Sequence, residues 1–318
     1  MKVRLGIGIG ALPFSDSRAF WRWVDLCEGS GVDSIWQTDR LASSQPYLEA
    51  MSTMASLAGA TDRVKFGMNA VVVSVRDPLV LAKQCATIDY LSGGRLLPVF
   101  GVGRESAPEF RAAGIDPARR GARANEALEI MRRLWSEESV SFEGDHYRFE
   151  NCSISPRPVQ QPLPLWIGGS SRAAVRRTAR LGTGWLAGTE GPDRVAQTIR
   201  EIRAELALGE RRIDDDHYGA TVVFRFGEWD EPLVQQATQV RRRMASGTDP
   251  RDILAVGKAS EVIQRIREYT AAGASKLVLI PLARGDADLM DQTRRLTEEV
   301  LGVFHNNQAQ PSTTAPRE

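Results

Sequence analysis

Short apolar runs alternate along the chain with longer amphipathic stretches of helix length. The runs have the length and residue types of buried strands, and the stretches between them carry helix formers, N-cap residues and terminal glycines. The first four runs begin near residues 3, 34, 65 and 96, each 31 residues after the one before. Strands are predicted at 3–9, 33–38, 64–73, 96–100, 165–167, 184–187, 218–226 and 276–281.

Helices are predicted between these strands, at 16–28, 46–59, 77–91, 119–135, 172–181, 193–208, 260–272 and 286–303. Strands that alternate with helices indicate parallel strands joined by crossovers. Eight such units favour an α/β (β/α)8 TIM-type barrel over a doubly wound sheet. Residues 140–149 alternate and turn at 143–145, which predicts a β-hairpin insertion before the fifth strand. The polar segment 230–256 is expected to form a helical excursion after the seventh strand.

The domain organisation follows from the same pattern. Residues 1–305 are expected to form one barrel domain, since the strand–helix alternation runs through all of them. The last segment, 306–318, is polar and poor in apolar residues, so it is predicted to be a disordered tail.

Composition narrows the classes of function. The 318 residues are 42% hydrophobic and 25% charged with a net charge of +1, which is typical of a soluble globular protein and gives no case for nucleic acid or membrane binding. Three scattered cysteines and the lack of a signal peptide favour a reducing, cytoplasmic setting. The run Arg241-Arg242-Arg243 is interpreted as a solvated helix face. No metal site is expected, because the histidines are isolated: His146, His217 and His305.

The segment around residues 165–172 has the clearest local chemistry. A short apolar run leads through Gly168 and Gly169 to Ser170 and Ser171, and a helix follows directly. Such a turn directs backbone N–H groups, hydroxyls and the positive end of a helix outward, which suits a phosphate group. An ordinary strand–turn–helix corner with a good N-cap would have the same residues. These residues alone leave both interpretations open.

In a barrel of this kind the chemistry lies on loops that follow the strands. There the chain places Asp39, Arg40, Asn69, Gly103 and Arg104. Asn69 is either a functional group or a polar residue that caps a strand end, and Asp39 is either functional or a loop acid, solvated or paired with Arg40. The loops offer few acids, bases or nucleophiles beside the predicted phosphate turn. This combination suggests that a bound cofactor carries the reaction.

Four segments in order resemble the luciferase-like family, whose members are (β/α)8 oxidoreductases that use reduced FMN or the deazaflavin coenzyme F420. The resemblance covers roughly residues 3–300. The matching segments are SIWQTDR at 34–40, VKFGMNAVVV and RDP within 64–78, IDYLSGGRLLPVFGVGR at 88–104 and SPRPVQQPLPLWIGGSS at 155–171.

The resemblance implies roles for the cofactor phosphate. Ser170 and Ser171, with Gly169 before them, match residues that bind this phosphate through backbone and hydroxyl groups. Arg104, after Gly103, matches an arginine that supports the same phosphate or the edge of the flavin. These positions are therefore expected to be cofactor-binding.

The resemblance also implies roles near the cofactor ring. Asn69 and Ala70 fall where the family often has a non-proline cis peptide beside the ring, and Asp39 matches an acid that contacts the deazaflavin in F420-dependent members. Many members carry a histidine directly after this acid, where this chain has Arg40. Because an arginine stays protonated, it cannot act as a general base. Asp39 and Arg40 are the catalytic candidates, with Arg40 expected to hold an anionic cofactor or substrate group.

The expected function is that of an F420-dependent oxidoreductase that transfers hydride to or from a small organic substrate. The alternatives are an FMNH2-dependent monooxygenase that consumes O2 and a non-catalytic flavin-binding protein. A barrel aldolase or isomerase is disfavoured, because Lys65 and Lys276 lie at strand starts. The resemblance implies a homodimer, and the stripe Met51, Met54 and Leu57 would serve either its interface or the core.

Overall fold

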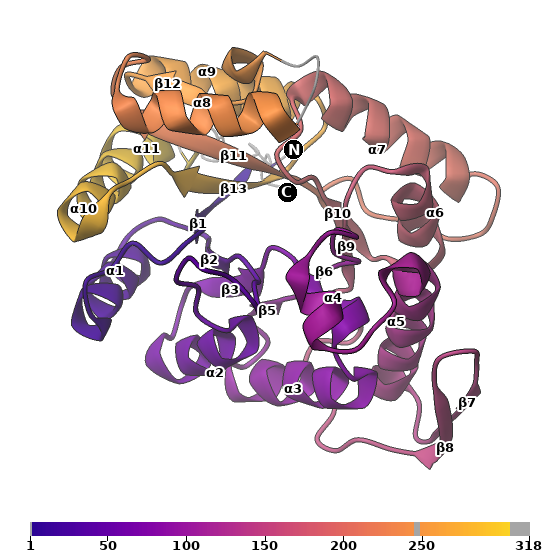
Figure 1. Ribbon diagram of the computed structural model, residues 1–318. Coiled ribbons are helices and arrows are strands. Elements are labelled where there is room, and N and C mark those ends of the chain that lie inside the picture. The colour runs from indigo at the N-terminus through magenta and orange to yellow at the C-terminus, as the bar shows by residue number, and fades with distance from the viewer. Residues whose placement is uncertain (1, 245–248, 306–318) are drawn as a thin grey trace, which may run out of the picture.

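A computed structural model describes residues 2–244 and 249–305, and the tail predicted at 306–318 lies outside these residues. A curled parallel sheet forms the centre of the molecule, with helices on its outer side (Figure 1). Its strands are β1 (Arg4–Ile9), β2 (Ser34–Gln37), β3 (Lys65–Met68), β4 (Val71–Val72), β5 (Leu96–Leu97), β6 (Val99–Gly101), β9 (Trp166–Gly168), β10 (Gly184–Leu186), β11 (Tyr218–Phe226), β12 (Ala255–Gly257) and β13 (Lys276–Pro281).

The strand order explains the curl of the sheet. Hydrogen-bonded neighbours follow the order β4-β6-β9-β10-β11-β13-β1-β2-β3-β5, with β12 paired to β11, and every pair is parallel. Only residues 69–70 separate β3 from β4, and only Pro98 separates β5 from β6. The two ends of the order are therefore continuations of the same two chain segments. The predicted α/β, TIM-like class of fold is confirmed.

The helices cover the sheet in the predicted alternation. They are α1 (Ser17–Gly29), α2 (Ala50–Ala60), α3 (Pro78–Leu91), α4 (Pro108–Ala112), α5 (Arg120–Ser136), α6 (Arg172–Leu181), α7 (Pro192–Leu206), α8 (Pro232–Met244), α9 (Ala259–Ala271), α10 (Gly285–Arg295) and α11 (Leu301–His305). Asp16 begins α1 by accepting a hydrogen bond from the Ala19 N–H at 2.8 Å. Within the described ranges, no helix combines the length and the apolar character needed to cross a bilayer.

Several predicted bounds were wrong. The third strand, predicted at 64–73, stops at Met68 and gives way after β4 to the 3-10 turn η1 (Val73–Val75). The second helix begins at Ala50, not at 46, because the Glu49 carboxylate caps it there by accepting from the Ser52 N–H at 2.7 Å. The short helix α4 was not predicted.

The helical excursion predicted at 230–256 was only partly right. It begins with α8, as expected, and residues 245–248 lie outside the described part of the chain. Its last part contains the 3-10 turn η3 (Pro250–Asp252) and the strand β12, which pairs with β11 through Phe224 and Ala255. Residues 255–257 therefore extend the sheet, which a polar, helix-prone composition did not indicate.

Two tryptophans fill the space enclosed by the curled sheet. Trp36 from β2 and Trp166 from β9 form one buried cluster with Val99, Leu186 and Val278. The strands leave room for the rings by carrying glycine beside them. A Cβ atom on Gly67 would lie 2.6 Å from the Trp36 ring, and one on Gly184 would lie 2.4 Å from the Trp166 ring. Close packing of this kind fixes the relative positions of strands whose ends carry the candidate residues.

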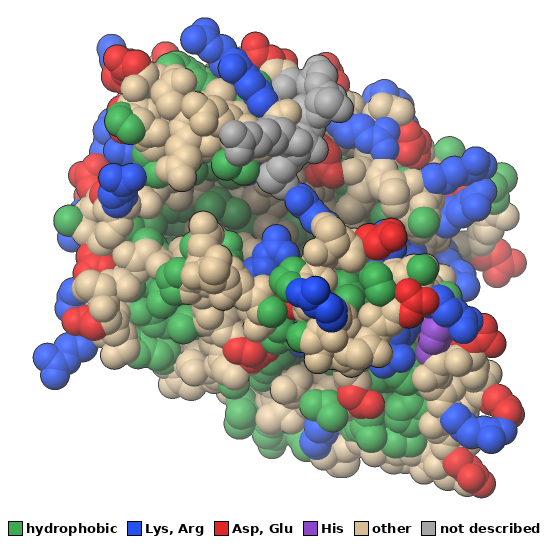
Figure 2. All heavy atoms as spheres, in the orientation of Figure 1, with side chains coloured by type: hydrophobic (Ala, Val, Ile, Leu, Met, Phe, Trp, Pro, Cys, Tyr) green, Lys and Arg blue, Asp and Glu red, His purple; other side chains and the backbone are tan. Residues whose placement is uncertain are grey.

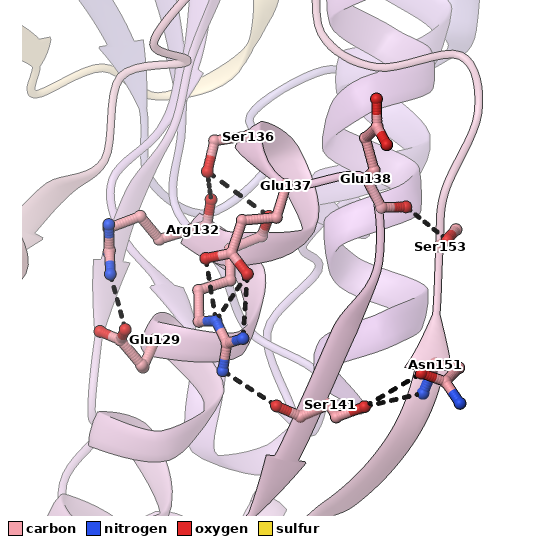
Figure 3. A network of polar contacts seen from close by, with 9 residues as sticks. Glu129, Arg132, Ser136, Glu137, Glu138, Ser141, Asn151 and Ser153 are labelled. Carbon is pink, nitrogen blue, oxygen red and sulfur yellow. Dashed lines mark hydrogen bonds and ion pairs between the residues drawn. The ribbon is translucent and has the colours of Figure 1, made fainter.

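A hairpin of β7 (Val140–Glu143) and β8 (Arg148–Cys152) precedes β9, as predicted. Figure 3 shows the polar network that holds it beside the end of α5. Arg133 donates to the Glu137 carboxylate at 2.9 Å and to the backbone oxygen of Ser141 at 3.0 Å. Across the hairpin, the Asn151 N–H donates to Ser141 Oγ at 3.0 Å. The insertion is therefore a positioned part of the structure, on the outer side of the helices.

The apolar stripe on α2 belongs to the core. Met51, Met54 and Leu57 are 2%, 0% and 0% exposed. These side chains therefore pack in the core and are not available for an interface. The opposite face of α2 carries exposed Ser52, Ala55 and other small residues.

Candidate functional site

The predicted site residues meet at the rim where the parallel strands end. They lie after β2 (Asp39 and Arg40), between β3 and β4 (Asn69 and Ala70), after β6 (Gly103 and Arg104) and after β9 (Gly169, Ser170 and Ser171). The helices α4 and α8 follow β6 and β11 at the same rim. Figure 2 shows this face of the molecule hollowed between α8 and α4.

The turn after β9 has the geometry of an anion site. Gly169 has a φ of +98°, which favours glycine, and its carbonyl accepts from Trp185 Nε1 at 2.8 Å. Ser171 is the N-cap of α6, because its Oγ accepts from the Ala174 N–H at 3.2 Å. Within the described residues, the N–H groups of Ser170 and Ser171 have no acceptor. They stand free at the positive end of a helix, where an anion would be stabilised.

A carboxylate that sequence analysis missed lies beside this turn. Ser170 Oγ donates to Glu190 Oε1, and Arg194 donates to the carbonyl oxygen of Ser170. The other carboxylate oxygen of Glu190 is buried and has no partner among the described atoms. The Ser170 hydroxyl is thus occupied by a carboxylate, so an anion at this turn is expected to use backbone N–H groups and nearby cations. Glu190 lies in a loop without periodicity, which left no signal in the sequence.

Two arginines supply positive charge on this side of the rim. Arg104 is exposed, and its side chain has no hydrogen-bond or ion-pair partner within the described residues. Arg241 on α8 is half-buried, so the prediction of a fully solvated face for this run was wrong at that position. Burial and the charge of Arg104 lower the pKa of Arg241, whereas Tyr269 and Glu190 act in the opposite direction. These interactions place Arg241 in the same electrostatic environment as Glu190 and Arg104.

Asp39 is held by an arginine that the sequence analysis did not single out. Arg76 donates to both oxygens of Asp39, at 2.7 and 2.9 Å, and to Glu49 at 3.0 Å. The Val72 N–H donates to Asp39 Oδ2 at 3.0 Å. Burial disfavours the charge of Arg76, but the bonds and charges of Asp39 and Glu49 outweigh it, so the pKa of Arg76 is raised. The expected alternatives for Asp39, a solvated acid or a partner of Arg40, were wrong.

Arg40 remains a free cation at the rim. It is half-buried and makes no hydrogen bond or ion pair in the part of the chain that the structure describes. Its neighbour Asp39 is already neutralised by Arg76. A half-buried arginine whose side chain is unpaired can bind a carboxylate or phosphate group of a ligand at two points.

Between β3 and β4 the peptide bond from Asn69 to Ala70 is cis, as the resemblance implied. The side chain of Asn69 donates to Thr221 Oγ1 at 2.8 Å, so it bridges to β11. The Ala70 side chain lies close to glycines of two strands, because a Cβ atom on Gly101 or Gly168 would lie 3.6 or 3.5 Å from the Ala70 Cβ. The lack of side chains on Gly101 and Gly168 leaves bare backbone next to Ala70, against which a flat ring system would fit.

Gly103 shapes the loop that carries Arg104. Its φ is +72°, and a Cβ atom there would lie 2.8 Å from Val72 and 3.1 Å from the Phe110 ring. Only glycine meets both conditions at this position. Gly103 therefore sets the path of the backbone toward Arg104, and its predicted contact with a cofactor stays a prediction.

A cavity of about 400 Å³ borders the network of Asp39 and Arg76. It lies between the starts of α1 and α2, and its apolar lining includes Phe14, Trp21 and Leu48. Glu49, which receives Arg76, forms part of its wall. An apolar group of a small organic ligand would fit this lining.

One histidine is less isolated than the sequence analysis stated. The ligand atoms of Asp214, Asp216 and His217 lie within 4.8 Å of one another, before the start of β11. Arg4 already binds Asp216 at 2.8 Å, and the His217 ring contacts the Thr183 carbonyl oxygen at 3.0 Å. The group lies at the opposite end of the strands from the predicted site residues, and we assign it no role at the site.

The rim thus has what a phosphorylated redox cofactor needs from a protein. It offers free N–H groups at a helix start, unpaired arginines, and bare backbone beside Ala70 for a ring. The described rim has little acid–base machinery free for catalysis, since the Asp39 carboxylate is bound by Arg76. Residues far apart in sequence supply these contacts, which is why Arg76, Glu190 and Arg241 escaped the sequence analysis.

Comparisons with known proteins identify the family to which this chain is similar. The model of the luciferase-like monooxygenase family matches residues 6–276. An F420-dependent glucose-6-phosphate dehydrogenase of Intrasporangium calvum is 27% identical over 304 residues, which cover 83% of this chain and 89% of that enzyme. An FMNH2-dependent dimethylsulfone monooxygenase of Pseudomonas fluorescens is 30% identical over 235 residues, which cover 73% of this chain and 59% of that enzyme.

Other similarities are shorter or structural. The chain spans about half the length of the first curated relatives it matches, mycobacterial proteins described as uncharacterized. The solved structure of an F420-dependent secondary alcohol dehydrogenase in complex with an F420–acetone adduct has a TM-score of 0.81 at 18% identity, covering 95% of this chain and 99% of that one. At such low identity this similarity supports the fold alone.

Proposed function

The chain belongs to the luciferase-like monooxygenase family, and we propose that it is an F420-dependent oxidoreductase that transfers hydride to or from a small organic substrate. The choice of F420 over FMN rests on one observation. Gly169, Ser171 and Arg172 at the anion-binding turn are exposed, so the turn is open to solvent. FMN ends at its phosphate, whereas F420 continues beyond it. An open turn suits a cofactor whose chain passes through the phosphate site and onward.

The fold assignment is part of this proposal. The curled sheet is an eight-unit (β/α)8 barrel, counting β3 with β4 and β5 with β6 as interrupted strands, and residues 1–305 form one domain. This count is supported by the pairing of β3 with β5 and of β4 with β6.

In the proposed complex the protein binds and orients the cofactor. The free N–H groups of Ser170 and Ser171 hold the phosphate, and Arg104 balances its charge. Ala70 and Asn69 would border the ring. F420 would supply a carbon centre that gives or takes a hydride without activating O2. The chain's own contribution to the reaction is position, charge and the exclusion of water.

Arg40 is assigned to the anionic partner of the reaction. Since its guanidinium stays charged near neutral pH, it cannot take a proton from a substrate. It stabilises instead a negative charge on the reduced cofactor or a carboxylate or phosphate group of the substrate. The Arg76–Asp39 pair fixes the loop on which Arg40 lies. The apolar cavity between α1 and α2 is a candidate site for the rest of the substrate.

A second candidate is an FMNH2-dependent monooxygenase that consumes O2. The 30% identity to the Pseudomonas fluorescens enzyme favours it, since the aligned residues cover 73% of this chain. A non-catalytic flavin-binding protein would bind a cofactor and turn nothing over. Consumption of oxygen separates the first alternative from our proposal, and lack of turnover separates the second.

We also propose that the protein is a homodimer. The outer face of α3 exposes Val80, Tyr90 and Leu91, which are 55%, 56% and 63% exposed. The adjacent α2 contains no charged residue in its eleven positions, and its outer face is built of small side chains. The two faces together make a surface with few charges, among them Lys83 of α3, that a second copy would cover. Sedimentation equilibrium with Leu91→Glu, expected to favour the monomer, tests this point.

The proposed function is tested by anaerobic turnover. Purified protein is mixed with F420 or its reduced form and a panel of small alcohols, aldehydes and enones, and the deazaflavin absorbance is followed. We expect a change in F420 redox state that depends on both protein and substrate and that proceeds without O2. Turnover only with reduced FMN and O2 would favour the monooxygenase instead.

A further inference from the structure

Helix α6 carries a stripe of arginines that begins at the anion-binding turn. Arg172, Arg176 and Arg180 are spaced four residues apart, so they lie on one face of the helix. All three are exposed. With a rise of about 1.5 Å per residue, the stripe extends about 12 Å from the helix start. Ser171, the N-cap next to the predicted phosphate position, directly precedes its first member.

The stripe lacks the carboxylates that would normally balance it. The sequence of α6, RAAVRRTARL, has four arginines and no acid. Within the described residues, Arg172 and Arg180 have no ion-pair partner, and Arg176 has only Glu205 at 3.8 Å with its side chain 58% exposed. Like charges four residues apart destabilise a helix, and Arg172 lies at the positive end of the helix dipole. The contacts within the described fold therefore do not account for this concentration of positive charge.

A cavity lies beside the far half of the stripe. It has a volume of about 280 Å³ and is lined by Arg176, Arg180 and Arg211, with Glu205 as the carboxylate in its wall. Arg211 is held in place by the carbonyl oxygens of Ala179 and Gly182, at 2.8 and 2.7 Å. Burial and the charge of Arg132 on α5 lower the pKa of Arg211, whereas Glu129 acts in the opposite direction. The cavity is therefore lined by three arginines and one carboxylate.

We infer that this stripe and its cavity bind the oligoglutamate tail of the cofactor, an inference that rests on the proposed function. In F420 the phosphate is a diester that continues into γ-linked glutamates, each of which adds one carboxylate. The tail leaves the phosphate at the turn, one residue before Arg172, and follows the stripe along α6. Guanidinium groups pair with carboxylates at two points. FMN has no tail, so the stripe also selects between the two cofactors.

The test compares F420 that carries its oligoglutamate tail with the lactyl form that lacks glutamates. Fluorescence titration at low salt gives the dissociation constant of each form for the native protein and for Arg176→Gln/Arg180→Gln. These two positions are away from the phosphate turn and exposed, so the variant is expected to fold. Arg267→Gln/Arg294→Gln is the matched control, because it removes the same charge from exposed positions on α9 and α10 (Figure 1).

We expect the native protein to bind the tailed form about tenfold more tightly than the tail-free form, as several exposed ion pairs would give. The stripe variant loses this difference and binds the tail-free form as the native protein does, while the control keeps the difference. Added salt weakens the tailed form more steeply. Equal binding of both forms by the native protein, or an undiminished difference in the stripe variant, overturns the inference alone. Binding of neither form overturns the proposed function as well.

Discussion

Arg76 donates hydrogen bonds to both oxygens of the Asp39 carboxylate, with Nη1 2.7 Å from Oδ2 and Nη2 2.9 Å from Oδ1. The side chains are 11% and 1% exposed, so the pair is shielded from water. It joins the loop after β2 to the segment after η1, and a third contact to Glu49 extends it to the start of α2. The pair therefore defines the wall of the rim on which Arg40 is presented.

The first prediction concerns this pair. Asp39→Asn leaves the buried guanidinium of Arg76 with the more exposed Glu49 as its carboxylate partner, and we expect the free energy of unfolding to fall by about 3 kcal/mol. Urea denaturation at neutral pH measures the change. The exposed pair of Arg119 and Asp145 is the control, since its side chains are 55% and 74% exposed. Asp145→Asn should cost less than about 1 kcal/mol. Equal costs at the two sites would contradict the structural role of Asp39.

The second prediction concerns acid stability. Glu28 accepts from the N–H groups of Asp62, Arg63 and Val64, at 2.9, 2.6 and 2.9 Å. Burial raises the pKa of Glu28, but these bonds outweigh it, so the pKa lies below its ordinary value. Because the folded pKa is lowered, the stability from Glu28 is present above the unfolded pKa of about 4.3 and is lost as pH falls through the folded value.

Glu28→Gln should therefore lower the free energy of unfolding by about 1–2 kcal/mol at neutral pH. The gap to the native protein should shrink as the pH falls below about 4. Urea denaturation across this range measures the gap. Glu210→Gln, at an exposed position without a partner in the described chain, is the control and should show almost no gap. A gap for Glu28→Gln that stays constant with pH would show that the carboxylate charge is not responsible.

The third prediction concerns the backbone at Gly103. Gly103→Ala meets both a left-handed φ of +72° and a Cβ contact of 2.8 Å with Val72. We expect it to lose about 2–4 kcal/mol of stability and to weaken cofactor binding, since it moves the loop that carries Arg104. Gly114→Ala is matched in φ, at +67°, but has open space around the added atom. It should cost about 1 kcal/mol, measured by thermal or urea unfolding. A smaller loss at Gly103 than at Gly114 would be inconsistent with the packing described.

The fourth prediction concerns the anion-binding turn. Ser170→Asp places a negative charge beside free N–H groups and next to Glu190, so cofactor binding should be abolished while the fold is kept. Ser260→Asp adds the same charge at the start of α9, another helix N-terminus, and should leave binding unchanged. Titration and circular dichroism measure the two effects. Native affinity in a folded Ser170→Asp protein would contradict the assignment of the cofactor phosphate to this turn.

Much of the fold could be predicted from local pattern, because alternating strands and helices leave few arrangements. The prediction failed where the local structure depends on residues that are distant in the sequence. Gly67 makes room for Trp36 only because β2 and β3 are neighbours, and no local pattern indicates this. The strand predicted at 64–73 ran through the cis bond at Asn69, because one polar residue in an apolar run does not by itself mark an interruption. Only the family resemblance pointed to a cis bond there.

The candidate site was predictable to a similar degree. Glycines and serines after a strand pointed to Ser170 and Ser171, since a turn and a cap have local signatures. Arg76 lies 37 positions from Asp39 and meets it only through the shape of the rim. Arg241 belongs to a polar run that looked solvated, and its partial burial depends on how α8 lies over the rim. Roles that arise from tertiary contacts had no sequence signal.

The most direct test of the account is a fluorescence titration of the purified protein with F420, FMN and reduced FMN under anaerobic conditions. We predict micromolar binding of F420, with FMN and reduced FMN bound much more weakly. Ser170→Asp should abolish the F420 signal. Selective binding of reduced FMN, or binding of none of the three, would contradict the assignment of this protein as an F420-dependent oxidoreductase.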